Sequence, residues 1–223
     1  MSKTRAVPFF WQTILALTAV LAVALTIFFG GSRTAGAATS SDPSEYVRAF
    51  GDRVIAVVAD TTLSPEQRQA TLARVLAEGI DSRKIGRFVL GKHGRVASDA
   101  EQAEFDRLFA SGIVATYSRH LGNYAGESLE VGGAKALDAG GVMVGSRIVR
   151  PDGPPVAVEW RLHGEAGAWR IVDLVIEGVS LALTLRSEYA AVIRAGGGKV
   201  EGLLSRLREQ VAAADLQVAA NSN

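Results

Sequence analysis

The chain has 223 residues, of which 48% are hydrophobic and 21% are charged, so a packed core can form and disorder of most of the chain is excluded. A formal net charge of +1 gives no indication of nucleic acid as a partner. Cysteine is absent, which excludes disulfide bonds, thiolate catalysis and Cys-ligated metal sites. His93, His120 and His163 are far apart in the sequence, so we expect neither a metal nor a cofactor.

The N-terminal segment has the pattern of an export signal. Two basic residues precede an apolar run over residues 14–29, and a box of small residues follows at 35–38. A basic start, an apolar middle and an A-x-A box predict a secretory signal peptide over residues 1–37. The alternative is an uncleaved inner-membrane anchor, because residues 9–29 are nearly long enough to span a bilayer.

Cleavage after Ala37 would leave a mildly acidic exported chain. The segment removed carries three of the 24 basic residues and no acidic residue, so 21 basic residues remain against 23 acidic ones, a net charge of −2. This charge argues against tight adsorption to anionic lipid surfaces, and the lack of cysteine suits the bacterial periplasm. We expect a polar linker over residues 38–44, a folded domain over 45–215 and a disordered tail over 216–223.

Capping signals predict four helices in the first half of this domain. Asp42 precedes a proline, Ser64 and Ser98 each begin a capping box, and the acidic Asp81 stands before another apolar segment. Apolar residues follow each of these caps at helical spacing. The first half of the domain is therefore predicted to be helical throughout.

The second half changes to an alternation of apolar and polar residues, which is typical of strands with one buried face. Residues 142–149 and 156–163 alternate in this way, and the turn sequence Pro151-Asp152-Gly153-Pro154 lies between them. Residues 169–176 are more apolar throughout, which predicts a central strand, and a weaker strand is expected near residues 128–131.

Two more helices, over residues 181–193 and 200–211, are predicted to follow this sheet. The predicted fold class is α+β, with amphipathic helices packed on one antiparallel β-meander sheet. A twisted sheet covered on one side by helices can leave an apolar cleft between them, and such clefts hold apolar ligands.

One short motif, Gly178-Val179-Ser180-Leu181-Ala182, is similar to the nucleophile elbow of esterases. That motif needs a glycine where Ala182 stands and a histidine later in the chain, and no histidine follows Ser180. We therefore interpret Ser180 as the cap of the next helix and predict that the protein is not an enzyme. A small serine esterase that uses Ser180 remains the alternative function.

Several stretches together carry a family resemblance. They are DSRKIGRFVLGKH (81–93), the positions Phe105, Phe109, Tyr117, Leu121 and Tyr124, RIVRPDG (147–153), VEWRL (158–162), WRIVDLVIEGVSL (169–181) and RSEY (186–189). Through them the segment over residues 78–207 resembles the MlaC / toluene-tolerance family of periplasmic phospholipid-binding proteins. Trp160 stands where that family usually has tyrosine, and Thr184-Leu185 replaces a polar–aromatic pair, so the shape of the pocket is expected to differ.

The resemblance implies a monomeric shuttle that carries phospholipid across the periplasm. Its implied partners are an outer-membrane lipoprotein complex and an inner-membrane ABC lipid transporter with a membrane-anchored lipid-binding ring. A related branch of the family is associated with hopanoid-producing bacteria, so a hopanoid or another polycyclic lipid is the alternative cargo. Neither a cofactor nor a catalytic residue is needed for this role.

We predict that a lipid would be lined by apolar side chains from both the sheet and the helices. The predicted strand positions are Val144, Ile148, Val158, Trp160, Leu162, Val172 and Leu174, and the predicted helix positions are Phe109, Ile113, Tyr117 and Leu183. The face of the third strand is left open, because Ile171 and Val175 could line the cavity instead of Val172 and Leu174.

Overall fold

The computed structural model describes residues 41–121, 126–138, 140–164 and 168–220. The side chains of some residues near the ends of the two longest helices are also outside what it describes. The predicted signal peptide lies outside the described residues. Within the described part, no helix has the length and apolar character needed to cross a membrane.

In the part of the chain that the structure describes, seven helical segments lie before and after the sheet. They are α2 (Pro43–Ala59), α3 (Pro65–Gly79), α4 (Ser82–Leu90), the 3-10 helix η1 (Gly91–Arg95), α5 (Asp99–Leu121), α6 (Leu181–Ala195) and α7 (Glu201–Ala220). The predicted caps are confirmed. Asp42 accepts a hydrogen bond from the Ser44 amide, Asp81 accepts one from the Lys84 amide, and Ser64 and Ser98 each form a reciprocal capping box. Helix α7 continues to Ala220, into the segment expected to be a disordered tail.

The strands form one antiparallel meander, as the α+β prediction required. They are β1 (Ser128–Ala136), β2 (Val142–Val149), β3 (Val156–His163), β4 (Arg170–Ile176) and β5 (Val179–Ser180), and their order in the sheet is the same as in the chain. Strand β1 is longer than the weak strand expected near its start.

The prediction that the third apolar strand lies at the centre of the sheet is wrong. Strand β4 is followed only by the two-residue β5, so β3 takes the central place. The apolar character of β4 has a different cause, because α4 and α6 cover the face of β4 that α2 and α3 leave open. A strand covered on both faces needs apolar residues at successive positions wherever it lies in the sheet.

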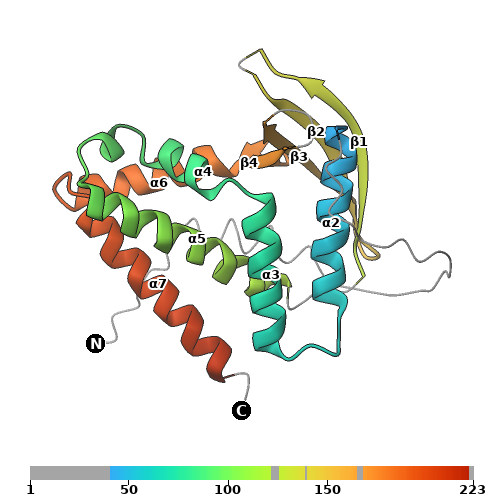
Figure 1. Cartoon of the computed structure of the whole chain (residues 1–223), viewed down its shortest axis with the longest axis horizontal. Coiled ribbons are helices and arrows are strands. Elements are labelled where there is room, and N and C mark those ends of the chain that lie inside the picture. Colours follow the sequence, from blue (N-terminus) through green and yellow to red (C-terminus); the bar gives the residue numbers. More distant parts are fainter. Residues whose placement is uncertain (1–40, 122–125, 139, 165–167, 221–223) are drawn as a thin grey trace.

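Two hydrophobic clusters form the core of the described residues, and Figure 1 labels the helices and strands that carry them. In the sheet cluster, α2 and α3 pack on one face of the sheet, and its buried members include Val47, Phe50, Leu72, Val144, Trp160 and Leu162. In the helix cluster, α4, α5, α6 and α7 pack on one another, with Ile85, Phe105, Phe109, Ile193 and Leu204 among its buried members. Ile80 and Ile113 contact both clusters, so they mark the seam between them.

Candidate functional site

The segment between α3 and α4 holds Ile80 at the seam through backbone hydrogen bonds. The Ile80 amide donates to the Leu76 carbonyl at 2.8 Å, which ends α3, and the Asp81 amide donates to the carbonyl of Ile171 on β4 at 2.9 Å. Ile80 and Ile171 also form an isolated parallel bridge. The end of one helix is therefore attached to the sheet at the point where the two clusters meet.

A small hollow opens at this seam. It has a volume of about 50 Å³ and is lined by Leu76, Ala77, Ile80, Ser82, Ala110, Ile113 and Val114, from α3, the start of α4 and α5. Ligand pockets for small molecules usually enclose about 300–1,000 Å³. This hollow is therefore far smaller than a ligand pocket, and because no strand residue lines it, it lies beside the place where the apolar cleft was expected between sheet and helices.

Most of the predicted lining residues lie in the two clusters. Val144, Val158, Trp160 and Leu162 are buried in the sheet cluster, with Ile148 and Leu174 packed against it. Phe109 and Val172 belong to the helix cluster. Leu183 is 59% exposed, and the side chain of Tyr117 lies outside what the structure describes.

The register of β4 separates residues that were expected to share a face. Trp160 pairs with Leu174, but a shift follows between Arg161 and Leu162, so that Leu162 pairs with Ile171. Leu174 and Ile171 consequently both pack on the sheet cluster, whereas Val172 packs on the helix cluster. Neither of the two alternating patterns considered from the sequence describes this strand, because an irregular pairing inverts the alternation.

Of the residues that line the hollow, Ile113 alone was among the lining positions predicted from the sequence. Ala110, Ile113 and Val114 recur at helical spacing on α5, so the stripe itself was visible in the sequence. The position of Ile80 between a helix-ending glycine and a helix cap was also visible. That these two segments would meet depends on tertiary packing and carries no local signal.

Comparison with known proteins connects this fold to one family. The family model described as MlaC protein matches residues 48–209. The chain belongs to the MlaC protein family. The "Toluene tolerance protein ttg2D" of Pseudomonas putida is 23% identical over 160 residues, 71% of this chain and 74% of that protein. The "Intermembrane phospholipid transport system binding protein MlaC" of Haemophilus influenzae is 22% identical over 207 residues, 89% of this chain and 92% of that protein.

A solved structure also shares the fold of this MlaC-family chain. It is the phospholipid-binding protein from Ralstonia solanacearum, determined in complex with a phospholipid, with a TM-score of 0.68 and 23% sequence identity. The likeness covers 78% of this chain and 99% of that one. The family resemblance found in the sequence is therefore confirmed, and the fold extends over nearly the whole of the solved relative.

Ser180 has the geometry of a helix cap in this MlaC-family fold. Its hydroxyl donates to the Asp173 carboxylate at 2.6 Å and accepts from the Leu183 amide at 3.1 Å, while Asp173 also accepts from the Ala182 amide at 3.0 Å. No hydrogen bond joins Ser180 to a histidine within the described residues. The serine and the buried Asp173 therefore fix the start of α6 and do not form a nucleophile–base pair.

Two ionisable groups on α6 have shifted pKa values. Burial raises the pKa of the half-buried Glu188 carboxyl to about 7, and the positive charge of Arg206 on α7 opposes this shift. Burial also raises the pKa of Tyr189, whose ring makes edge contacts with Phe105 and Phe109 in the helix cluster. Burial is the main cause of both pKa shifts.

No group of acidic or histidine residues that could hold a metal occurs in the part of the chain that the structure describes.

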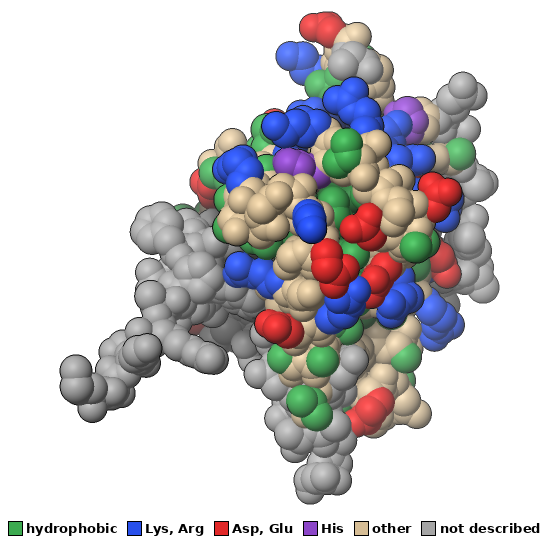
Figure 2. Space-filling view, turned by 90° about the vertical axis from the view of Figure 1, so that its left-hand side faces the viewer, with side chains coloured by type: hydrophobic (Ala, Val, Ile, Leu, Met, Phe, Trp, Pro, Cys, Tyr) green, Lys and Arg blue, Asp and Glu red, His purple; other side chains and the backbone are tan. Residues whose placement is uncertain are grey.

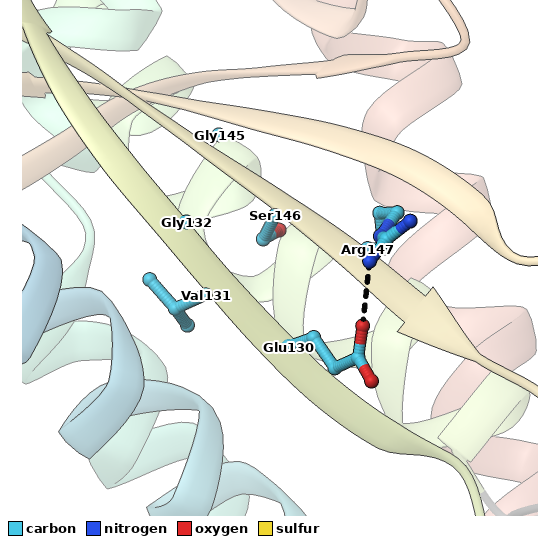
Figure 3. Close-up of a pocket in the computed structure, with 6 residues that line it drawn as sticks. All are labelled: Glu130, Val131, Gly132, Gly145, Ser146 and Arg147. Carbon is cyan, nitrogen blue, oxygen red and sulfur yellow. Dashed lines mark hydrogen bonds and ion pairs between the residues drawn. The ribbon is translucent and has the colours of Figure 1, made fainter.

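A second hollow lies on the sheet, between β1 and β2 (Figure 3). It has a volume of about 300 Å³ and is lined by Glu130, Val131, Gly132, Gly145, Ser146 and Arg147. The register shifts between Val131 and Ala134, and the glycines leave space where side chains would otherwise stand. Figure 3 shows Glu130 and Arg147 meeting at one end, where their ion pair measures 3.0 Å. This charged end makes the hollow a poor site for acyl chains.

Proposed function

We propose that this MlaC-family chain is a periplasmic carrier that binds phospholipid acyl chains between its sheet and its helices and moves lipid between membranes. The seam hollow is the observation that carries the proposal, because it opens where two apolar clusters meet and is lined almost entirely by apolar side chains. The names of the relatives support the cargo. One is called a binding protein of an intermembrane phospholipid transport system, and another was solved with phospholipid bound.

The energetics suit a carrier that exchanges lipid with a bilayer. An acyl chain moved from water to an apolar site gains about 0.8 kcal/mol per methylene, so two long chains gain roughly 20 kcal/mol or more. Moved from a bilayer, the same chains gain almost nothing, because the bilayer interior is equally apolar. The direction of transfer must then come from partner proteins.

Loading requires the two clusters to part, because a hollow of about 50 Å³ is far too small for a lipid. Parting would expose the apolar side chains that meet at Ile80 and Ile113. Acyl chains inserted at the seam would cover these side chains again, so most of the apolar burial would be restored.

The proposed partners are those of an intermembrane lipid transport system. They are an inner-membrane ABC transporter with its membrane-anchored lipid-binding ring and an outer-membrane lipoprotein complex. The proposal includes export through the N-terminal segment, with cleavage after Ala37. An esterase is not supported, since MlaC proteins are lipid-binding carriers and Ser180 caps a helix.

The test is to express the full chain with export, purify it and extract it with organic solvent. Mass spectrometry is expected to find a diacyl phospholipid in a fixed ratio to protein, and the intact mass is expected to match a chain that begins after Ala37. A hopanoid in the extract would keep the carrier and change its cargo. Protein that contains no lipid after this procedure, and takes none up from phospholipid vesicles, would contradict the proposal.

A further inference from the structure

Two large exposed apolar side chains occur where α4 meets α6. Phe88 on α4 is 41% exposed, and Leu183 on α6 is 59% exposed. Arg186 connects them, because its guanidinium carbon lies 4.9 Å from the centre of the Phe88 ring and it follows Leu183 by one turn of α6. Exposed apolar side chains that gather in this way mark contact surfaces more often than isolated ones do.

The segment that carries Phe88 is rich in basic residues. The segment over residues 82–98 contains five basic residues, Arg83, Lys84, Arg87, Lys92 and Arg95, and no acidic residue. Of these five, only Arg83 lies within 4 Å of a carboxylate among the described residues, at 3.9 Å from Asp106. A side chain at Gly91, the first residue of η1, would touch the Arg186 guanidinium, so Arg186 lies beside this basic segment as well.

We call Phe88, Leu183, Arg87, Lys92 and Arg186 the α4–α6 patch. Figure 2 views the molecule from the side on which η1 and the turn between α6 and α7 lie. Lys and Arg side chains predominate over the upper part of this face with apolar side chains between them, whereas basic and acidic side chains are mixed lower down. The local charge of this surface is therefore opposite in sign to the net charge expected of the exported chain.

We propose that the α4–α6 patch docks on the anionic headgroup surface of a phospholipid bilayer. Lys and Arg side chains attract anionic headgroups, and exposed apolar side chains beside them can enter the layer just below the headgroups. Salt screens charges over about 8–10 Å, so a local basic surface is attracted even when the whole molecule is slightly acidic. The proposal rests on the proposed carrier function, in which the cargo comes from a bilayer.

The position of the patch relative to the seam supports this use. Helix α4 begins at Ser82, which lines the seam hollow, and Phe88 lies near its other end. A helix of nine residues is about 13 Å long, so a bilayer bound at the patch lies close to the place where acyl chains would enter. A bilayer also offers both negative charge and apolar material at one surface, which matches the mixture of Arg, Lys and apolar side chains here.

The test measures vesicle binding by sedimentation at low salt. The vesicles are phosphatidylcholine alone or phosphatidylcholine with roughly a quarter phosphatidylglycerol. We expect the wild type to bind the anionic vesicles at least about ten-fold more tightly than the neutral ones. The double variant Lys92→Gln/Arg186→Gln is expected to lose roughly 25-fold in affinity for the anionic vesicles, about five-fold for each charge removed. The variant Phe88→Gln is expected to weaken binding to both vesicle types.

Matched controls separate the patch from general effects. Arg74→Gln/Lys135→Gln makes the same change in net charge at exposed positions on α3 and β1, and Leu216→Gln removes an apolar side chain that is 72% exposed on α7. The controls carry the same N-terminal segment as the patch variants, so any contribution of that segment to vesicle binding is the same in all of them. The controls are expected to bind vesicles like the wild type. All variants are expected to keep their phospholipid after purification.

Equal vesicle binding by patch and control variants would overturn the docking proposal. Wild-type binding that is equally tight with and without phosphatidylglycerol in the vesicles would overturn it as well. Retained cargo would then leave the carrier function standing, whereas lipid-free protein that still binds anionic vesicles through the patch would contradict only the carrier function.

Discussion

The start of α6 depends on the side chains of Ser180 and Asp173, residue types that also occur in catalytic sites. Asp173 is buried on β4 and accepts hydrogen bonds from both the Ser180 hydroxyl and the Ala182 amide. Asp173 thereby satisfies the Ala182 amide, and Ser180 satisfies the Leu183 amide, two of the amides that the first turn of a helix leaves without partners. At this scale the structure favours a capping role for Ser180.

The variant Ser180→Ala is therefore expected to lose about 1 kcal/mol of unfolding free energy and to keep its bound lipid. The hydroxyl that it removes accepts from the Leu183 amide, so the loss is that of a helix cap. Urea denaturation measures the first effect, and lipid extraction measures the second. Ser187→Ala, on an exposed position of α6, is the control and is expected to change neither. Ester hydrolysis by the wild type that disappears in Ser180→Ala would contradict this prediction.

Glu188 is expected to make the stability depend on pH. Burial raises its pKa from an ordinary 4.5 to about 7, so the folded state binds its proton more tightly than the unfolded state does. The resulting stabilisation is present at low pH and is lost as the pH rises from about 4.5 through 7. Because solvent screens a half-buried group, we expect Glu188→Gln to gain only about 1 kcal/mol over the wild type at pH 8.

Urea denaturation across this pH range measures the effect of Glu188. The difference between Glu188→Gln and the wild type is expected to grow with rising pH. Glu209→Gln changes an exposed carboxyl on α7 and serves as the control. A Glu188→Gln variant that shows the pH dependence of the wild type would mean that burial at this position does not govern its titration.

At the scale of elements, α2 and α3 approach each other at a glycine. A Cβ atom at Gly79 would collide with the ring of Phe50, which in turn makes an edge contact with Trp160 at a centroid distance of 6.0 Å. The Tyr46 hydroxyl donates to the Gly79 carbonyl at 2.9 Å and fixes the same crossing. The end of α3, and with it the position of Ile80, therefore depends on the absence of a side chain at Gly79.

Gly79→Ala is expected to destabilise the protein by about 1–3 kcal/mol, because the added methyl group must displace a ring that is packed in the sheet cluster. Gly112→Ala is the matched control, since a Cβ atom at this position on α5 would have no atom within 4 Å. That variant is expected to be stabilised by about 0.5–1 kcal/mol, because alanine favours a helix interior. Thermal or urea denaturation of both variants measures the contrast, and a neutral Gly79→Ala would show that Phe50 moves aside freely.

At the scale of the whole molecule, the core is divided into two clusters that meet at one seam. The two clusters share β4 and α5, and among the described residues Ile80 and Ile113 pack against both. A core that is divided in this way can open along one surface while each part keeps its own packing. The proposed loading of lipid at the seam requires a core that is divided in this way.

Ala110→Phe is expected to block that site. Ala110 lines the seam hollow and is only half-buried, so a phenyl ring can enter the hollow and occupy the space where acyl chains would begin to insert. The amount of phospholipid that copurifies is expected to fall at least about five-fold. Ala103→Phe makes the same change at an exposed position two turns earlier on α5 and is expected to keep its lipid. A folded Ala110→Phe that retains a full complement of phospholipid would place the binding site elsewhere.

Much of the local structure followed from the sequence because its causes are local. The caps at Asp42, Ser64, Asp81 and Ser98 each act within four residues, so the starts of four helices could be predicted directly. The alternating strands and the turn between them also indicated the meander, and the ordered motifs indicated the family.

The arrangement of the candidate site depended on contacts between distant segments, which no local pattern contains. The place of β4 beside the edge, and the register shift that separates Val172 from Leu174, were decided by pairing with β3 and by the helices on both faces. The exposure of Leu183 was decided by how α6 lies against α4. Sequence by itself determined which segments form helices and strands and to which protein family the chain belongs. Tertiary structure decided where the two clusters meet, because packing selects among the faces that each amphipathic element offers.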